Sequence, residues 1–228
     1  MIEVNGITKK YGRKKVLDGV SFTAEKGEIT CLIGINGAGK TTIMNAIMSM
    51  TPIKGGSILM DGDEIGKDSY EKITFIPDAI TMLPQMSIAD AMQFMKDFYK
   101  GWNEKRADEL LSFFRLKQED RISSLSKGNR AKANLLLGLA LDVDYLLMDE
   151  PFSGIDLFSR EQIAEVFASH LVEDRGVLIT THEINDIEHL IDKVVMLDDG
   201  KVLTEFRTEE MREEEGKSVV DVMREVYQ

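Results

Sequence analysis

The stretch ITCLIGINGAGKTTI, Ile29–Ile43, joins an apolar, strand-like run to a helix-like segment through a turn that holds three glycines and a lysine. Glycines let the backbone adopt positive φ and approach a ligand closely, so that successive N–H groups can point at phosphate oxygens. A helix that starts at this turn directs its positive end to the same place, and Lys40 adds a full charge. The pattern GxxxxGK[ST] predicts a site for the triphosphate tail of ATP, built from Gly34, Asn36, Gly37, Ala38, Gly39, Lys40, Thr41 and Thr42.

An acidic pair follows a second apolar run, LLMDE (Leu146–Glu150). Asp149 ends the run and delivers a carboxylate to the end of the sheet where the phosphate loop is expected, as the Mg²⁺-holding acid of P-loop ATPases does. Glu150 is the best candidate for the general base that orients or deprotonates the attacking water. By itself, such a pair is also common in a plain turn at the end of a strand.

The remaining pattern predicts the α/β class. ITFIP (Ile73–Pro77), DYLLMD (Asp144–Asp149) and VLITTH (Val177–His182) are short apolar runs that end in polar or small residues, which is typical of buried parallel strands. Parallel strands need helical crossovers, and helices are expected over Gly39–Ser49 and Leu157–Leu171. The prediction is a P-loop NTPase core of the RecA-like kind, with a parallel sheet.

Two further regions are expected around this core. Alternating apolar and polar residues near the N-terminus and again in GGSILMDGDEI, Gly55–Ile65, indicate a small antiparallel sheet. No strand is expected in residues 81–142, where Ser87 should cap one helix (Ile88–Tyr99), Asn103 a second, and a third should run from Gly128 to Leu141. We therefore predict an inserted α-helical subdomain within an ATP-binding domain of residues 1–206.

The C-terminal part carries a predicted hairpin, KVVMLDDGKVLTEF, and then a charged helical extension over residues 207–228. We interpret its run of glutamates, Glu209–Glu215, as the solvated face of a helix.

Charge and composition argue against several classes of protein. With 28 lysines and arginines against 40 acidic residues, the net charge is −12, which leaves little basis for nonspecific binding of nucleic acid. The single cysteine, Cys31, cannot form an internal disulfide, and no secretory leader is recognisable. The most apolar long stretch, Asn134–Met148, is interrupted by two aspartates and is shorter than the roughly 20 apolar residues of a membrane helix. We expect a cytoplasmic protein.

The motif LSKGN, Leu125–Asn129, resembles the LSGGQ signature of ABC ATPases, and the whole of Ile2–Phe206 resembles the ATP-binding subunit of ABC transporters. In that family the motif opens a helix and contacts the γ-phosphate held by a second copy of the domain. Ser126 and Gly128 match the motif and would make this contact. Lys127 and Asn129 depart from it, and we expect them to tune the contact.

Other family elements fall in the same order along the chain. PFSGID resembles the D-loop, which implies that Ser153 and Asp156 cross the dimer interface. His182 matches the switch histidine that reaches the γ-phosphate, although from spacing alone it reads as a histidine at a helix start. Tyr11 matches the aromatic residue that stacks on adenine, with packing within its strand as the alternative.

One position departs from the family. Where the family has the glutamine of its Q-loop, which contacts Mg²⁺ and the transmembrane partner, this chain has Asp78. A carboxylate can also offer a hard oxygen to magnesium. The implied metal site therefore consists of Thr41, Asp78 and Asp149.

The resemblance implies an enzyme that hydrolyses ATP with Mg²⁺. As a homodimer or heterodimer, it would power a separate transmembrane permease from the inner face of the cell membrane. The signature variant, Asp78 and the tail together resemble the ATPases of Gram-positive exporters of drugs and antimicrobial peptides, with no nucleic-acid partner. The alternatives are a soluble ABC ATPase of translation or DNA repair, and a regulatory nucleotide-binding module with weakened catalysis.

Overall fold

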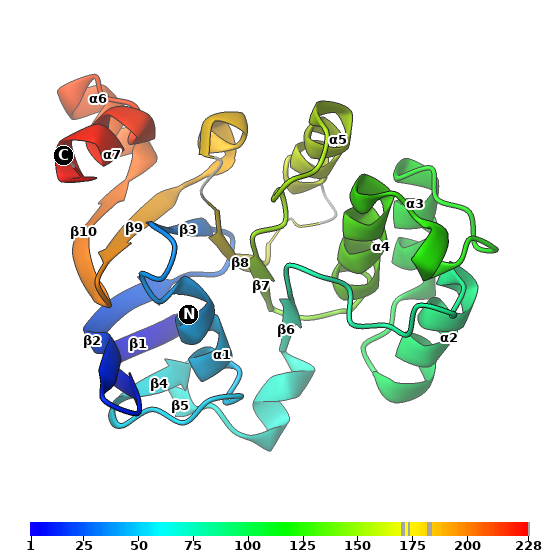
Figure 1. Ribbon diagram of the computed structural model, residues 1–228, viewed down its shortest axis with the longest axis horizontal. Coiled ribbons are helices and arrows are strands. Elements are labelled where there is room, and N and C mark those ends of the chain that lie inside the picture. Colours follow the sequence, from blue (N-terminus) through cyan, green and yellow to red (C-terminus); the bar gives the residue numbers. More distant parts are fainter. Residues whose placement is uncertain (170–171, 173, 182–183, 228) are drawn as a thin grey trace.

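The computed structural model describes residues 1–169, 172, 174–181 and 184–227. Its central layer is a six-stranded sheet in the order β10-β9-β3-β8-β7-β6 (Figure 1). The strands are β3 (Ile29–Gly34), β6 (Ile73–Ile76), β7 (Tyr145–Asp149), β8 (Gly176–Thr180), β9 (Lys193–Asp198) and β10 (Lys201–Arg207). All neighbouring pairs are parallel except β9 and β10, which form the expected hairpin. The α/β prediction is confirmed.

A second, antiparallel sheet has the order β2-β1-β4-β5. It consists of β1 (Ile2–Tyr11), β2 (Lys14–Ala24), β4 (Gly55–Met60) and β5 (Asp63–Glu64). Helix α1 (Lys40–Ile47) buries Ile43, Met44 and Ile47 in a core shared with strands of both sheets. The helix that follows the glycine turn is thus held rigidly between the two layers, and it is shorter than the sequence predicted.

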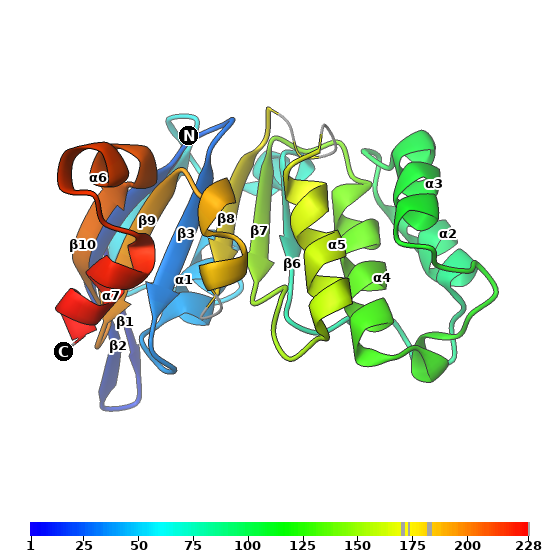
Figure 2. The same ribbon diagram turned by 90° about the horizontal axis from the view of Figure 1, so that it is seen from above.

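The helices between β6 and β7 lie at one end of the molecule (Figures 1 and 2). They are α2 (Ile88–Phe98), α3 (Glu104–Phe113) and α4 (Lys127–Leu139), with short 3-10 turns η1 (Lys67–Glu71) and η2 (Ile122–Ser124) before and within this region. The predicted caps form, since Ser87 accepts from the N–H of Asp90 and Asn103 accepts from the N–H of Arg106. Helix α4 begins one residue earlier and ends two residues earlier than expected.

Helix α5 (Leu157–Phe167) follows β7, and its expected last residue, Leu171, lies outside the described residues. After β8 come the 3-10 turns η3 (Ile184–Asp186) and η4 (Glu188–Leu190). The chain finishes with α6 (Thr208–Glu215) and α7 (Val219–Tyr227). The glutamates of α6 are exposed, as predicted, whereas α7 buries Val219 and Val222 against the main core, which the sequence did not indicate.

None of the helices in the described part of the chain has both the length and the apolar character needed to cross a bilayer.

Candidate functional site

The predicted phosphate loop and acidic pair meet at the carboxyl edge of the large sheet. There β3 ends at Gly34, β8 at Thr180 and β7 at Asp149, and β8 lies between the other two strands. In α/β proteins this edge is where ligands bind, because the loops that leave neighbouring parallel strands diverge and open a crevice.

The glycines of the loop are required by its geometry. Gly37 has φ of 90° and Gly39 has φ of 109°, a region that side chains rarely adopt. A Cβ atom on Gly34 would lie 2.6 Å from the carbonyl oxygen of Leu197, and one on Gly39 would lie 2.7 Å from Cδ2 of Leu17. Gly39 is the N-cap of α1 and offers no side chain to cap it. The first turn of α1 therefore keeps its N–H groups for an anion.

Lys40 lies at the centre of this loop with only 7% of its surface exposed. Its Nζ donates to the carbonyl of Gly34 over 2.7 Å and lies 3.7 Å from Oε1 of Glu150. Asn36, Gly37 and Thr41 are exposed, Thr42 is half-buried and Ala38 is buried. A buried ammonium with one carboxylate neighbour is well placed to exchange these partners for phosphate oxygens.

The acidic pair is positioned by a residue that the sequence analysis missed. Thr180 Oγ1 donates to Oδ1 of Asp149 over 2.5 Å and accepts from the backbone N–H of Glu150 over 3.0 Å. Glu150 also donates its N–H to the Thr180 carbonyl and adopts a left-handed φ of 48°, which side chains rarely adopt outside functional turns. The Thr-rich end of VLITTH was the available signal for this role.

A second group of predicted residues gathers at the start of α4. Ser126 is its N-cap and accepts from the N–H of Asn129 over 3.2 Å. Gly128 is buried against α5, where a Cβ atom would lie 2.3 Å from Oγ of Ser159 and 2.9 Å from Oδ2 of Asp156. The glycine of the LSKGN motif is therefore required for packing within one chain, apart from any ligand.

The predicted D-loop residues belong to the same group. Asp156 is the N-cap of α5, and it accepts from the N–H and the hydroxyl of Ser159 over 3.0 and 2.8 Å. These hydrogen bonds hold the pKa of Asp156 below its ordinary value. Ser153 is half-buried and donates its N–H to the carbonyl of Glu150. The exposed side chain of Lys127 lies over Gly154 in this loop.

Two other predicted residues, Tyr11 and Asp78, make contacts of their own or lie at the surface. Tyr11 ends β1 with its ring half-exposed, its hydroxyl 3.2 Å from Oγ1 of Thr51 and the ammonium of Lys9 over the ring. Asp78 is exposed, two residues beyond β6. The carbonyl of the intervening Pro77 accepts from Asn134 of α4. His182 lies outside the described residues.

The contacts thus form two groups, one around Lys40 and Asp149 and one around Ser126 and Asp156. Figure 2 shows the starts of α1 and α4 well apart along the sheet. In one chain, the phosphate loop does not reach the LSKGN helix.

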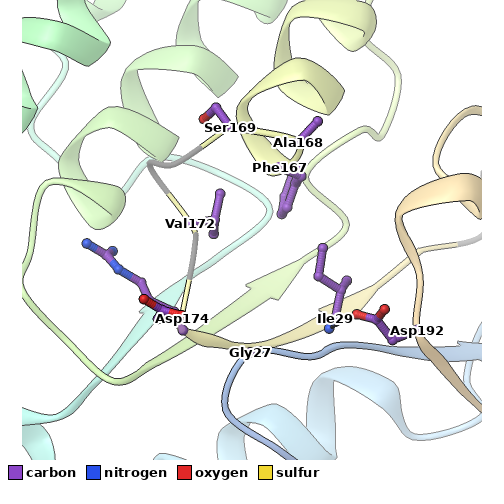
Figure 3. Close-up of a pocket in the computed structure, with 9 residues that line it drawn as sticks. Gly27, Ile29, Phe167, Ala168, Ser169, Val172, Asp174 and Asp192 are labelled. Atoms are coloured by element: carbon purple, nitrogen blue, oxygen red, sulfur yellow. Dashed lines mark hydrogen bonds between the residues drawn. The ribbon is translucent and has the colours of Figure 1, made fainter.

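A separate cavity of about 340 Å³ lies at the opposite edge of the sheet, under Phe167 and Val172 (Figure 3). It is lined by Ile29, which begins β3, and by Asp192, whose carboxylate accepts from the Ile29 N–H over 2.7 Å. The cavity is therefore remote from the loop that follows the other end of β3.

Sequence comparison decides the family. The family model described as ABC transporter matches residues 17–153. The chain belongs to the ABC transporter family. It is an ATP-binding subunit of that family and an ATPase, and the LSKGN and LLMDE motifs both lie within the matched residues.

Curated ABC relatives support this assignment over most of their length. The linearmycin resistance ATP-binding protein LnrL of Bacillus subtilis is 32% identical, covering 89% of this chain and 68% of the relative. The petrobactin import ATP-binding protein YclP of the same species is 31% identical, covering 100% and 92%. The Nod factor export ATP-binding protein I of Ralstonia nicotianae is 30% identical, covering 97% and 72%.

Solved ABC structures share the fold. An ATP-binding subunit of an ABC transporter superposes with a TM-score of 0.87 over 100% of both chains at 24% identity. A dimeric ATP-binding cassette bound to ADP and phosphate gives a TM-score of 0.79 at 23% identity, over 91% of this chain and 98% of that one. At these identities the likeness establishes the P-loop NTPase fold of the ABC cassette.

Proposed function

We propose that two ATP-binding subunits face each other head to tail, so that the phosphate loop of one and the LSKGN helix of the other enclose each ATP. The observation that carries this proposal is the separation of the two groups of residues within one chain. The amino end of α4 carries no acidic residue in its first turn, so it presents its N–H groups and helix dipole to an anion.

Within each site, we assign roles from the contacts at the sheet edge. The N–H groups around Gly37 and Gly39 and the ammonium of Lys40 hold the β- and γ-phosphates, and Tyr11 stacks on the adenine. Glu150 takes the proton of a water that attacks the γ-phosphorus, while the bond to the ADP oxygen breaks and ADP leaves with that electron pair. Thr180 keeps Glu150 directed at the water.

The residues present fit a magnesium ion that arrives with the nucleotide. Thr41 offers an exposed hydroxyl, and Asp149 and Asp78 offer carboxylates, which are the hard oxygen donors that Mg²⁺ prefers. Among the described residues no group of three His, Cys, Asp or Glu side chains could hold a metal without a nucleotide. Phosphate oxygens would therefore complete its coordination, and the ion would neutralise charge on the phosphates.

A mixing experiment tests the head-to-tail arrangement. Lys40→Ala removes the phosphate-loop cation, and Ser126→Asp keeps a good N-cap but places a negative charge against the phosphate. Each variant alone should lose ATP turnover. A mixed pair has one site with an intact loop and an intact LSKGN helix. Because random pairing of equal amounts makes half of the dimers mixed, mixing should restore turnover to roughly a quarter of the wild-type value.

The matched control is Ser126→Asn, a neutral N-cap that should retain activity. If mixing restores nothing while Ser126→Asn stays active, the shared site is wrong. If Lys40→Ala binds ATP as well as the wild type, the phosphate-loop assignment itself is wrong.

We further propose that a transmembrane permease docks on the outer side of α2, which places the subunit in the cytoplasm at the inner face of the cell membrane. Phe98 of α2 is 71% exposed and stacks on Phe94 with 4.5 Å between ring centroids. Beside it, Tyr70, Tyr99 and Val143 line a hollow of about 480 Å³. An aromatic surface with a hollow is suited to an amphipathic helix of a partner.

The acidic net charge of the subunit also supports a membrane-protein partner. Cytoplasmic loops of membrane proteins carry an excess of lysine and arginine, which complements a subunit of net charge −12. Phe98→Glu should abolish co-purification with the permease in membranes of the native host, whereas Leu203→Glu on β10, also an exposed apolar position, should not. Equal recovery of the permease by both variants would exclude the α2 surface.

For the direction of transport we propose export of an amphipathic compound such as a drug, peptide or lipid. The names of two relatives, which refer to linearmycin resistance and Nod factor export, support this direction. The name of the third relative, YclP, refers to petrobactin import, so the assay must distinguish export from import. Deletion of the gene should increase cellular retention of the exported compound, whereas an importer would show decreased uptake.

A further inference from the structure

The hydroxyl of Tyr227, near the end of α7, contacts the strands beside the phosphate loop. It donates to the carbonyl of Leu197 over 2.9 Å, and the carbonyl of Ile33 lies 3.3 Å from the same oxygen. These carbonyls belong to β9 and β3, which lie far from α7 in the sequence. The contact therefore connects the C-terminal helix to the end of β3, directly before the phosphate loop, and to the end of the neighbouring strand β9.

Both carbonyls bear on the position of Gly34. Ile33 directly precedes Gly34 in the chain, and Leu197 is the register partner of Gly34 in the parallel β3–β9 pair. The fit between them is tight, because a Cβ atom on Gly34 would lie only 2.6 Å from the Leu197 carbonyl oxygen. The carbonyl of Gly34 in turn holds Lys40. A displacement at Leu197 or Ile33 is thus passed to Lys40 through directly bonded or hydrogen-bonded groups.

Helix α7 is anchored independently at its other end. Ser218 and Asp221 cap it reciprocally, and its first N–H, on Val219, donates to Oε1 of Glu188 over 2.9 Å. Glu188 belongs to η4, in the segment that follows β8 and Thr180. Val219 and Val222 are buried in the main core. With both ends fixed, α7 can hold the Tyr227 hydroxyl in place.

We infer that Tyr227 is a positioning residue for the phosphate loop: its hydroxyl fixes the ends of β3 and β9 so that Gly34 and Lys40 are in place before the nucleotide arrives. The inference rests on the proposed role of this loop in holding the phosphates of ATP. It assigns to α7 a part in nucleotide affinity in addition to its packing.

The test removes the hydroxyl alone. Tyr227→Phe keeps the half-buried ring, and it should raise the Kd for Mg²⁺-ATP about threefold to tenfold, the change expected for one lost hydrogen bond. In the protein without nucleotide, amide hydrogen exchange over residues 33–41 should become faster. The matched control is Tyr145→Phe, which removes a hydroxyl bonded over 2.5 Å to Asp61 at the amino end of β7, at the opposite edge of the sheet.

A purely structural hydroxyl would lower the melting temperature in both variants and leave ATP affinity and exchange over residues 33–41 unchanged, which would overturn the inference. Faster exchange in Tyr145→Phe to the same extent would also overturn it. Failure of the proposed function looks different: Lys40→Ala would then keep wild-type ATP affinity, whatever Tyr227→Phe does to the exchange of the loop.

Discussion

The substitution Gly128→Ala separates the structural demand at the start of α4 from its proposed contact with ATP. The added Cβ would lie 2.3 Å from Oγ of Ser159 and 2.9 Å from Oδ2 of Asp156. Ordinary contacts between such atoms are about 3.5 Å. Either α4 and α5 must therefore separate by about 1 Å, or the Ser159 side chain must rotate and lose its hydrogen bond to Asp156, the N-cap of α5. Overpacking of this kind costs about 1–3 kcal/mol.

Two opposing terms set the net effect. Alanine is favoured over glycine within a helix by about 1 kcal/mol, which offsets part of the overpacking cost. With the overpacking cost taken at the middle of its range, about 2 kcal/mol, we expect a net loss of about 1 kcal/mol in the free energy of unfolding, or about 2–4 °C in melting temperature for a chain of this size. Thermal unfolding followed by circular dichroism measures this shift.

A double-mutant cycle identifies the cause. Ser159→Ala removes the nearest atom, so the cost of Gly128→Ala should fall by about 1 kcal/mol in that background. If the cost is unchanged there, or if Gly128→Ala alone melts at the wild-type temperature, the packing argument for this glycine is wrong. ATP turnover of the double variant then reports separately on the proposed contact with nucleotide.

Three further predictions address the site. Glu150→Gln should lower kcat for ATP hydrolysis by about 10²–10⁴ while ATP binding is retained, and an ATP-dependent dimer should accumulate in size-exclusion chromatography; full turnover would remove Glu150 from the mechanism. Asp78→Gln should shift the Mg²⁺ concentration for half-maximal hydrolysis and change permease-stimulated turnover, and the proposed role fails if neither moves. Burial raises the pKa of Tyr227 to about 12 from an ordinary value near 10. Its contribution to stability should therefore be complete below pH 10 and be lost as the pH rises from about 10 to 12. The difference in unfolding free energy between wild type and Tyr227→Phe across that range measures it, and a difference independent of pH would contradict the assignment.

Local sequence patterns were sufficient for the parts of the molecule whose chemistry is local. The glycine turn after Ile29–Ile33 predicted a strand, a phosphate loop and a helix, because only glycine permits φ near 90–109° at Gly37 and Gly39. The helix caps at Ser87 and Asn103 were also predicted correctly from the sequence, because a capping side chain accepts a hydrogen bond from an N–H only three residues away. The helix boundaries were less accurate, because tertiary packing decides where a helix frays.

Contacts between segments that are distant in the sequence could not be predicted from local patterns. Thr180 positions Asp149 from 31 residues away, and Tyr227 reaches Ile33 across 194 residues. The threonines that end VLITTH are a local signal for Thr180, and a tyrosine is unremarkable at position 227, but in neither case does the local sequence name the distant partner.

By itself, the sequence determined the class of the core, the location of the phosphate loop and the acidic pair, and, through its motifs, the family. The tertiary structure alone decided that Gly128 is required by the contact of α4 with α5, that α7 packs on the core, and that the phosphate loop and the LSKGN helix lie apart in one chain. The physical reason is that backbone conformation and capping depend on neighbours a few residues away, whereas close approach and burial depend on which surfaces the completed fold brings together.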